Sequence, residues 1–213
     1  LGGLSRSAGG GLMDAPVTTI DLLRHGEPVG GSRFRGTVDD PLSPAGWAQL
    51  ETATAGGACD RVVCSPLRRC REFAEMLARQ QGLECRVETD FREISFGLWE
   101  GLTSAQVEAD YGAALANFWN DPVAHPPPQG EPLADFCARV EAAWQRLIAD
   151  SRGQRVLVVA HGGTIAMLLR GVLGMPLSHS WRVRMGYAGQ ARLRLDHTPH
   201  GLLFALLRLE PGV

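Results

Sequence analysis

The sequence predicts an α/β fold, a three-layer α/β/α sandwich whose central sheet is mixed but mostly parallel. Short apolar runs alternate with helical patterns over most of the chain, which is typical of a sheet covered by helices on both faces. Two strand-like runs then follow each other directly, over residues 189–196 and 202–210, with the turn-rich residues 197–201 between them. The length of 213 residues suits one such domain rather than two.

The composition is that of an ordinary globular protein, with 45% hydrophobic and 21% charged residues. The net charge of −2 lacks the basic bias typical of proteins that bind nucleic acid or an anionic membrane. No apolar run is long enough to span a bilayer. The five cysteines are odd in number and lack CxxC spacing, so we expect a reducing, cytoplasmic setting without a disulfide framework.

The first residues differ from the rest of the chain. Residues 1–13 are rich in glycine and serine and have no hydrophobic periodicity, so we expect them to be flexible. Met13 is a candidate native start, which would make the residues before it a cloning remnant. We therefore assign a flexible segment to residues 1–13 and a single domain to residues 14–213.

The elements before residue 60 follow from local signals. Residues 17–23 are mostly apolar and predict a buried strand that ends at polar residues. A helix should follow a short loop, because Ser43 is a suitable N-cap and Pro44 suits the first helical position. Glycines at 56 and 57 should end this helix.

The next elements repeat the strand–helix pattern. Residues 60–66 predict a short central strand, and residues 65–82 predict a helix capped by Ser65. The inward side of this helix is apolar and holds Cys70, Phe73, Ala74 and Leu77. Residues 83–89 predict a third strand.

The second half of the chain predicts three more helices and a fourth strand. Residues 102–122 look helical in two pieces, and the proline-rich residues 123–130 should form a loop. Apolar residues at helical spacing between 133 and 148 predict a long amphipathic helix. An apolar run from residue 155 to the residue before His161 predicts the fourth strand, and residues 164–174 its following helix.

Polar and cationic residues follow three of the predicted strands. They are Arg24, His25 and Gly26 after the first, Ser65, Pro66, Arg68 and Arg69 after the second, and His161, Gly162 and Gly163 after the fourth. Because binding crevices of such sheets lie at the carboxyl ends of the strands, these residues should converge. Two histidines with at least two arginines predict an anion site, since guanidinium groups match phosphate geometry. The glycines allow the backbone to approach the anion closely.

The sequence also narrows the chemistry of this anion site. No GxxxxGK[ST] loop or GxSxG motif is present, and we expect no serine or cysteine nucleophile beside the histidines. An imidazole can itself attack phosphorus if its nitrogen is neutral and cations spread the charge of the equatorial oxygens. A carboxylate must then protonate the leaving oxygen and activate water. Residues 91–101, after the third strand, supply Glu93 and Glu100 with Arg92.

Four motifs in one order resemble those of the histidine phosphatase superfamily, also called phosphoglycerate mutase-like. They are LLRHGE, CSPLRRC, REISFGLWEG and VVAHGG, spread over nearly the whole chain after Met13. Each motif alone is a weak signal, whereas four in order are specific. The resemblance implies a phosphoglycerate mutase-like fold and phosphoryl chemistry on a small phosphate ester, with no metal and no cofactor.

The resemblance implies a role for five catalytic residues. His25 is the implied nucleophile and Glu93 the implied general acid and base, while three residues hold the phosphoryl group, namely Arg24, Arg69 and His161. Arg69 is preferred to Arg68 because Ser65 sets the register of the family's S-x-x-x-R pattern. Simpler interpretations remain open: Arg69 as a solvated helix residue, and Glu93 as a partner of Arg92.

The expected substrate-binding residues also include Gly26, Gly162 and Arg35. Many family members carry Thr or Ser three residues after the nucleophilic histidine and Asn six residues after it. Pro28 and Gly31 occupy those positions here, so two side-chain donors are missing. We hypothesise that Arg33 or Arg35 compensates by reaching in from this loop.

Other polar residues have simpler interpretations. Glu100 is expected to be a structural or surface carboxylate, and Trp99 a core residue. His197 and His200 form an HxxH pair in a turn, and two ligands do not make a metal site.

Two further features of the sequence limit the range of candidate reactions and substrates. Glu93 and His161 lie 68 residues apart, with modest lid material in residues 123–132, which favours hydrolysis over the mutase reaction. Residues 34–50 resemble a segment of α-ribazole phosphatases, so α-ribazole 5′-phosphate of cobalamin biosynthesis is the predicted substrate. The alternatives are a phosphoglycerate mutase, a broad sugar-phosphate or fructose-2,6-bisphosphate phosphatase, and a non-catalytic phosphate-binding regulatory protein. The oligomeric state stays open, with a homodimer as the candidate assembly.

Overall fold

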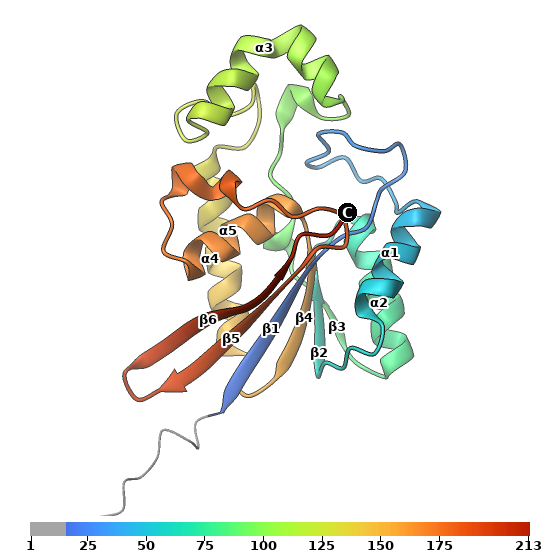
Figure 1. Ribbon diagram of the computed structural model, residues 1–213, viewed down its shortest axis with the longest axis vertical. Coiled ribbons are helices and arrows are strands. Elements are labelled where there is room, and N and C mark those ends of the chain that lie inside the picture. The colour runs from blue at the N-terminus through green and yellow to red at the C-terminus, as the bar shows by residue number, and fades with distance from the viewer. Residues whose placement is uncertain (1–15) are drawn as a thin grey trace, which may run out of the picture.

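The computed structural model describes residues 16–213, so the predicted flexible segment 1–13 lies outside the described residues. Six strands form one sheet in the order β3-β2-β4-β1-β5-β6 (Figure 1). Their bounds are Val17–Arg24 (β1), Arg61–Cys64 (β2), Cys85–Val87 (β3), Arg155–Ala160 (β4), Gln190–Thr198 (β5) and Gly201–Glu210 (β6). The strands β1, β2, β3 and β4 pair in parallel, whereas β5 and β6 are antiparallel to their neighbours. The predicted mixed, mostly parallel sheet is confirmed.

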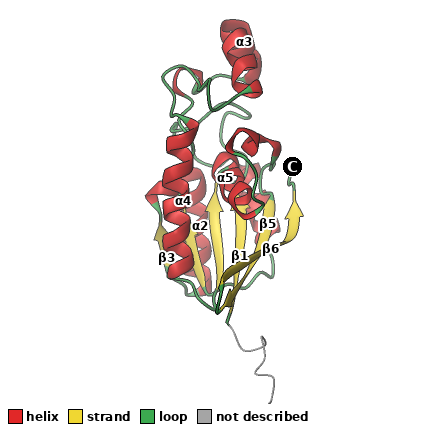
Figure 2. Cartoon of the chain, turned by 90° about the vertical axis from the view of Figure 1, so that its left-hand side faces the viewer, coloured by secondary structure: helices red, strands yellow, loops and turns green. Residues whose placement is uncertain are grey.

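Helices cover both faces of this sheet. The helices α1 (Pro44–Thr54) and α2 (Arg68–Gln81) lie on one face, and α4 (Leu133–Ala149) and α5 (Gly162–Val172) on the other (Figure 1). The helix α3 (Ser104–Asn120) stands beyond the carboxyl ends of the parallel strands (Figure 2). Short 3-10 helices lie in the connections, at Thr89–Phe91 (η1), Gly97–Trp99 (η2) and Leu177–Arg182 (η3). The predicted three layers are confirmed, with α3 added over one end.

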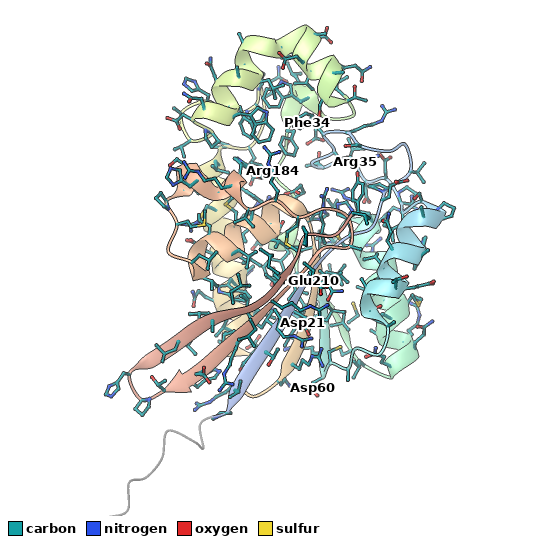
Figure 3. The ribbon with its side chains drawn as sticks, in the orientation of Figure 1. Asp21, Phe34, Arg35, Asp60, Arg184 and Glu210 are labelled. Carbon is teal, nitrogen blue, oxygen red and sulfur yellow. The ribbon has the colours of Figure 1, made fainter. Side chains whose placement is uncertain are left out.

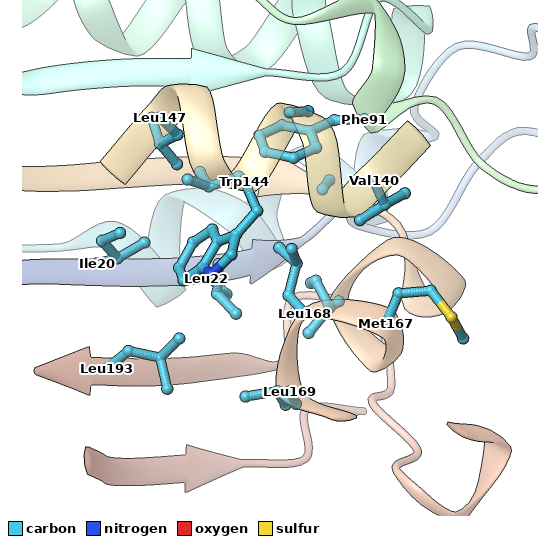
Figure 4. Close-up of a cluster of buried hydrophobic side chains, with 14 of the residues drawn as sticks. Ile20, Leu22, Phe91, Val140, Trp144, Leu147, Met167, Leu168, Leu169 and Leu193 are labelled. Atoms are coloured by element: carbon cyan, nitrogen blue, oxygen red, sulfur yellow. The ribbon is translucent and has the colours of Figure 1, made fainter. Parts of the chain in front are cut away.

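The largest apolar core lies between the sheet and the pair α4 and α5. Ile20, Leu22 and Leu193 of the sheet face Trp144 of α4 and Leu168 of α5 (Figure 4). A second core packs α1 and α2 on the opposite face, and a smaller one lies beneath α3. Complete burial of this apolar surface is the main stabilising contribution, at about 25 cal/mol per Å².

The sequence predicted two helix caps, at Ser43 and Ser65, and a break within residues 102–122, and the structure confirms two of these three predictions. Ser43 caps α1, since its side chain accepts from the backbone N–H of Gly46 at 3.0 Å. Tyr111 has non-helical dihedral angles within α3, which confirms a helix in two pieces. The cap predicted at Ser65 is wrong, because α2 begins at Arg68 after Leu67 and no side chain caps it. The hydroxyl of Ser65 has a different partner, described below.

A close contact joins α1 to the loop after β1. A Cβ atom on Gly26 would overlap the backbone of Gly46, and one on Gly46 would overlap that of Glu27. Glycine is needed at both positions because the two backbones touch. The contact fixes the loop that follows His25 against the first turn of α1.

Within residues 16–213, no helix has both the length and the apolar character needed to cross a bilayer. The five cysteines are present as free thiols.

Candidate active site

Three neighbouring parallel strands deliver the predicted residues to one edge of the sheet. Arg24 at the end of β1 pairs with Ala160 of β4, and Cys64 at the end of β2 pairs with Val159. The residues that follow these strands therefore lie side by side, because parallel strands end at the same edge. The predicted convergence is confirmed.

A cavity of about 390 Å³ opens at this edge. Six of the predicted site residues line it: Arg24, His25, Arg35, Arg69, Glu93 and Gly162. His161 lies behind His25, with 5.3 Å between the ring centroids, and its side chain is completely buried. The two imidazoles thus differ in access, because His25 reaches the cavity and His161 supports it from the core.

The ring of His25 is oriented by its own neighbour. Its Nδ1 atom lies 2.7 Å from the carbonyl oxygen of Gly26, and a carbonyl can only accept, so Nδ1 carries the hydrogen. Nε2 of the neutral ring then carries the lone pair. Burial, with added repulsion from the guanidinium groups of Arg69 and Arg24, lowers the pKa of His25 well below its ordinary value. The imidazole is therefore neutral at neutral pH, as a nucleophile must be.

The structure corrects one expectation about His161. A serine and a cysteine lie beside it: the hydroxyl of Ser65 is 2.6 Å from Nε2, and the Cys70 sulfur is 3.6 Å from the same atom. Both side chains are completely buried, and neither lines the cavity. Burial raises the pKa of Cys70 to about 12, so it stays a thiol. Ser65 and Cys70 hold His161 in place but do not face the cavity.

Two arginines flank the imidazoles, the buried Arg69 and the half-buried Arg24. The guanidinium of Arg69 donates to the backbone oxygens of Gly36 (2.9 Å) and Val38 (2.7 Å), and that of Arg24 donates to the oxygen of Met185. The Nε atoms of Arg24 and Arg69 are buried and have no partner among residues 16–213. An unpaired buried donor is costly, and a bound anion would satisfy both.

Glu93 is held at the start of α5. One carboxylate oxygen accepts from the backbone N–H of Ile94 and the other from that of Gly163, each at 3.0 Å. A Cβ on Gly163 would overlap this carboxylate, so the position of the Glu93 side chain depends on glycine there. The pairing with Arg92 considered above is not seen, because Arg92 contacts Asp90 instead. Glu93 is therefore fixed facing the cavity.

The remaining predicted binding residues take up different positions. Gly26 faces Gly46 and is not among the residues that line the cavity. Arg35 lines it but also pairs with Asp40 at 3.0 Å and donates to the oxygen of Val29 at 2.7 Å. Arg33 donates to the oxygens of Gly30 and Gly101, at 3.0 and 2.8 Å. Each thus has a partner within its loop.

Some cavity residues were not found by sequence motifs. The outer wall comes from α3, from η3 and from the segment after η3, through Trp119, Trp181, Arg184 and Tyr187. The ring of Tyr187 lies against the guanidinium carbon of Arg24 at 4.6 Å. Residues 123–132, expected to supply lid material, do not line the cavity. No pattern in the sequence marks these four residues, since their proximity depends on where α3 and η3 pack.

Other polar residues have structural positions. Glu100 accepts from Thr37, Ser95 and Phe96, which ties the loop before α1 to η2. Trp99 is completely buried, as expected. His197 contacts the hydroxyl of Thr18 at 2.8 Å. Among residues 16–213, no three His, Cys, Asp or Glu side chains are grouped so as to hold a metal ion.

A larger cavity, about 880 Å³, lies between α1 and the sheet. It contains none of the predicted catalytic residues. Its guanidinium groups at Arg155 and Arg192 both pair with Asp21, at 2.9 and 2.6 Å. Asp21 is labelled in Figure 3. The guanidinium groups of Arg155 and Arg192 are therefore paired, unlike the Nε atoms of Arg24 and Arg69 at the smaller cavity.

The two buried imidazoles predict a pH-dependent stability. Burial lowers the pKa of His161 as well as that of His25. Below about pH 6.5 the unfolded chain takes up protons that the folded protein does not, so stability is full above this pH and falls on acidification. Each histidine contributes up to about 1.4 kcal/mol per pH unit. Denaturant unfolding between pH 7 and 5 would measure this slope.

A variant comparison isolates the contribution of His25 to this slope. We expect His25→Asn to have a shallower pH dependence than the wild type. His200→Asn should keep the wild-type slope, because His200 is exposed. Equal slopes in all three proteins would contradict the prediction.

Comparisons with known proteins agree with this geometry. Residues 20–204 match a sequence model of the histidine phosphatase superfamily (branch 1). The chain is 36% identical over 172 residues to a glucosyl-3-phosphoglycerate phosphatase of Mycobacterium tuberculosis, covering 74% of this chain and 76% of that protein. It is 30% identical over 172 residues to the adenosylcobalamin/alpha-ribazole phosphatase of Escherichia coli, covering 77% and 83%.

A solved structure extends the similarity to the fold. The native mycobacterial glucosyl-3-phosphoglycerate phosphatase has a TM-score of 0.80 at 30% identity, over 92% of this chain and 100% of that chain. A match to a bifunctional protein of M. tuberculosis, 36% identical over 159 residues, covers 72% of this chain and 43% of that longer protein. The matched residues include every helix, all or part of each strand, and the residues that line the cavity. The chain belongs to the histidine phosphatase superfamily.

Proposed function

We propose that this protein is a phosphomonoester hydrolase that works through a phosphohistidine on His25. The observation that carries the proposal is a neutral, cavity-lining imidazole beside two arginines whose Nε atoms are buried and unpaired. Such donors match the equatorial oxygens of a phosphoryl group in transfer.

In the first proposed step, Nε2 of His25 attacks phosphorus and the bond from phosphorus to the ester oxygen breaks. Glu93 gives its proton to the departing oxygen, so the leaving group departs as an alcohol. Arg24 and Arg69 balance the charge that spreads over the equatorial oxygens. His161 lies behind His25 and supports its ring from the core.

In the second proposed step, water attacks phosphorus and the bond to Nε2 breaks. Glu93, now ionised, takes the proton of this water, which restores both residues and releases inorganic phosphate. The carboxylate needs to stay in one place for both steps. Its hydrogen bonds to the backbone of Ile94 and Gly163 support this.

Two substrates have specific support. The resemblance of residues 34–50 favours α-ribazole 5′-phosphate, and an E. coli relative is named an adenosylcobalamin/alpha-ribazole phosphatase. Glucosyl-3-phosphoglycerate is the second candidate, because the mycobacterial relative named for it is 36% identical. The mutase and the non-catalytic regulatory protein remain the alternative functions.

The test is phosphate release in EDTA from a panel of esters. The panel contains α-ribazole 5′-phosphate, glucosyl-3-phosphoglycerate, fructose 2,6-bisphosphate, 3-phosphoglycerate and p-nitrophenyl phosphate. We expect release that depends on His25 and a preference among the metabolites. Transfer between phosphoglycerates without net release would favour the mutase. Wild-type rates equal to those of His25→Ala on every ester would favour the regulatory protein.

Arg35 provides a separate prediction about substrate binding. We expect Arg35→Ala to raise KM about tenfold, which corresponds to one charge-assisted hydrogen bond. Arg33→Ala is the matched comparison, since Arg33 is exposed and its guanidinium donates to two backbone oxygens. Steady-state kinetics of both variants would test whether either arginine replaces the donors absent at Pro28 and Gly31. Unchanged kinetics in both would remove the hypothesis.

A further inference from the structure

The cavity contains more positive charge than one phosphoryl group requires. One carboxylate, that of Glu93, lines it together with five arginines: Arg24, Arg33, Arg35, Arg69 and Arg184. A phosphoryl dianion bound at His25 would be balanced by Arg24 and Arg69. The other three guanidinium groups would then face the alcohol portion of the ester.

Arg184 is distinct among these five arginines. The other four each donate to a backbone oxygen, and Arg35 also pairs with Asp40. For the side chain of Arg184, no hydrogen bond or ion pair is found within residues 16–213. Its contact is with an aromatic ring, since its guanidinium carbon lies 5.8 Å from the ring centroid of Trp119. All of its donors are therefore available to a ligand.

Arg184 and Trp119 lie at the solvent end of the cavity. Arg184 is exposed and Trp119 is 47% exposed, whereas His25 is 5% and Arg69 is 1% exposed. Burial thus increases from the mouth to the reacting atoms. Figure 3 shows Arg184, Phe34 and Arg35 beneath α3, and all three line the cavity.

The backbone fixes Arg184 relative to the phosphoryl end. The next residue, Met185, accepts a hydrogen bond from Arg24, and Tyr187 packs against the same guanidinium. One short segment therefore runs from the reacting end of the cavity to its mouth. The ring of Trp119 supports the Arg184 side chain, because a guanidinium near an aromatic face is attracted to it.

We propose that the enzyme prefers phosphate monoesters whose alcohol portion carries its own negative charge, which Arg184 binds at the mouth of the cavity. This inference rests on the proposed phosphatase function and adds the substrate class. A carboxylate on the leaving group would form a charge-assisted hydrogen bond there, for which we expect an effect of about tenfold or more. Of the two candidate substrates, glucosyl-3-phosphoglycerate has such a carboxylate.

The test compares two esters that differ in this group. Glycerol 3-phosphate and 3-phosphoglycerate share the same carbon chain, but only the second has a carboxylate. We expect wild-type kcat/KM to be about tenfold or more higher for 3-phosphoglycerate, with most of the difference in KM. Arg184→Gln should remove most of this ratio, and Arg184→Lys should restore part of it. Arg182→Gln is the matched control, because Arg182 is exposed two residues before Arg184, at the end of η3, but does not line the cavity.

Binding measured without turnover separates this inference from the proposed function. Calorimetry on His25→Ala should give a Kd for 3-phosphoglycerate about tenfold lower than that for glycerol 3-phosphate, and Arg184→Gln in this background should equalise them. That result would support the subsite even if the wild type released no phosphate. Equal Kd values for both esters in His25→Ala, or a ratio that survives Arg184→Gln, would overturn the inference. A preference for the neutral ester would point instead to Trp119 as a stacking surface for an uncharged leaving group.

Discussion

Replacement of His25 by alanine is expected to lower kcat by about 10⁴-fold or more, because the variant lacks the nucleophile of the proposed reaction. The fold should survive. The side chain of His25 makes one hydrogen bond, to the backbone of its neighbour Gly26, and a typical neutral hydrogen bond contributes about 1 kcal/mol.

The measurement combines kinetics with trapping of the intermediate. Wild-type enzyme mixed with a radiolabelled ester and quenched in alkali should retain label on histidine, and His25→Ala should retain none. His200→Ala is the matched control, since His200 is exposed in the turn before β6, and it should keep wild-type rate and label. Substantial turnover by His25→Ala, with unchanged thermal unfolding, would contradict the nucleophile assignment.

A similar comparison separates Ser65 from the reaction. Ser65 lies 2.6 Å from His161, which is the spacing of a serine–histidine pair. It is nevertheless completely buried and does not line the cavity. Label on serine in the trapping experiment would therefore refute the histidine mechanism directly.

Replacement of Glu93 by glutamine is expected to slow hydrolysis of alkyl phosphates by about 10² to 10⁴-fold, the usual contribution of a general acid. The first step with p-nitrophenyl phosphate should change much less, because p-nitrophenolate leaves without a proton. The amide keeps nearly the same shape, but its oxygen can accept from only one of the backbone N–H groups of Ile94 and Gly163, because the amide nitrogen is a donor.

Rapid mixing would resolve the two steps of Glu93→Gln. With p-nitrophenyl phosphate we expect a burst of about one equivalent of phenol per enzyme, followed by slow turnover, because water attack also needs this carboxylate. With an alkyl ester we expect no burst. Glu84→Gln is the matched control, since Glu84 is exposed and does not line the cavity. If Glu93→Gln slowed the first step equally with both esters, the general acid would be another residue.

Much of the fold follows from local sequence patterns. The apolar run of β1, the cap at Ser43 and the amphipathic pattern of α4 depend on neighbours in sequence, and the structure has each of them. Ser65 shows where this approach fails. Its position before a helix suggested a cap, but its hydroxyl contacts His161, a residue 96 positions away. A long-range hydrogen bond in the core cannot be recognised from the local pattern.

The sequence by itself determined the family motifs, the mixed sheet and the residues that converge at its edge, because strand ends and glycines are encoded locally. Only the tertiary structure decided which imidazole faces the cavity. His25 and His161 follow their strands in the same way, yet packing against Ser65 and Cys70 buries His161 completely. The tertiary structure also decided which residues form the mouth of the cavity. Trp119 and Arg184 lie 65 residues apart in the sequence, and they meet only because α3 and the segment after η3 fold over the same sheet edge.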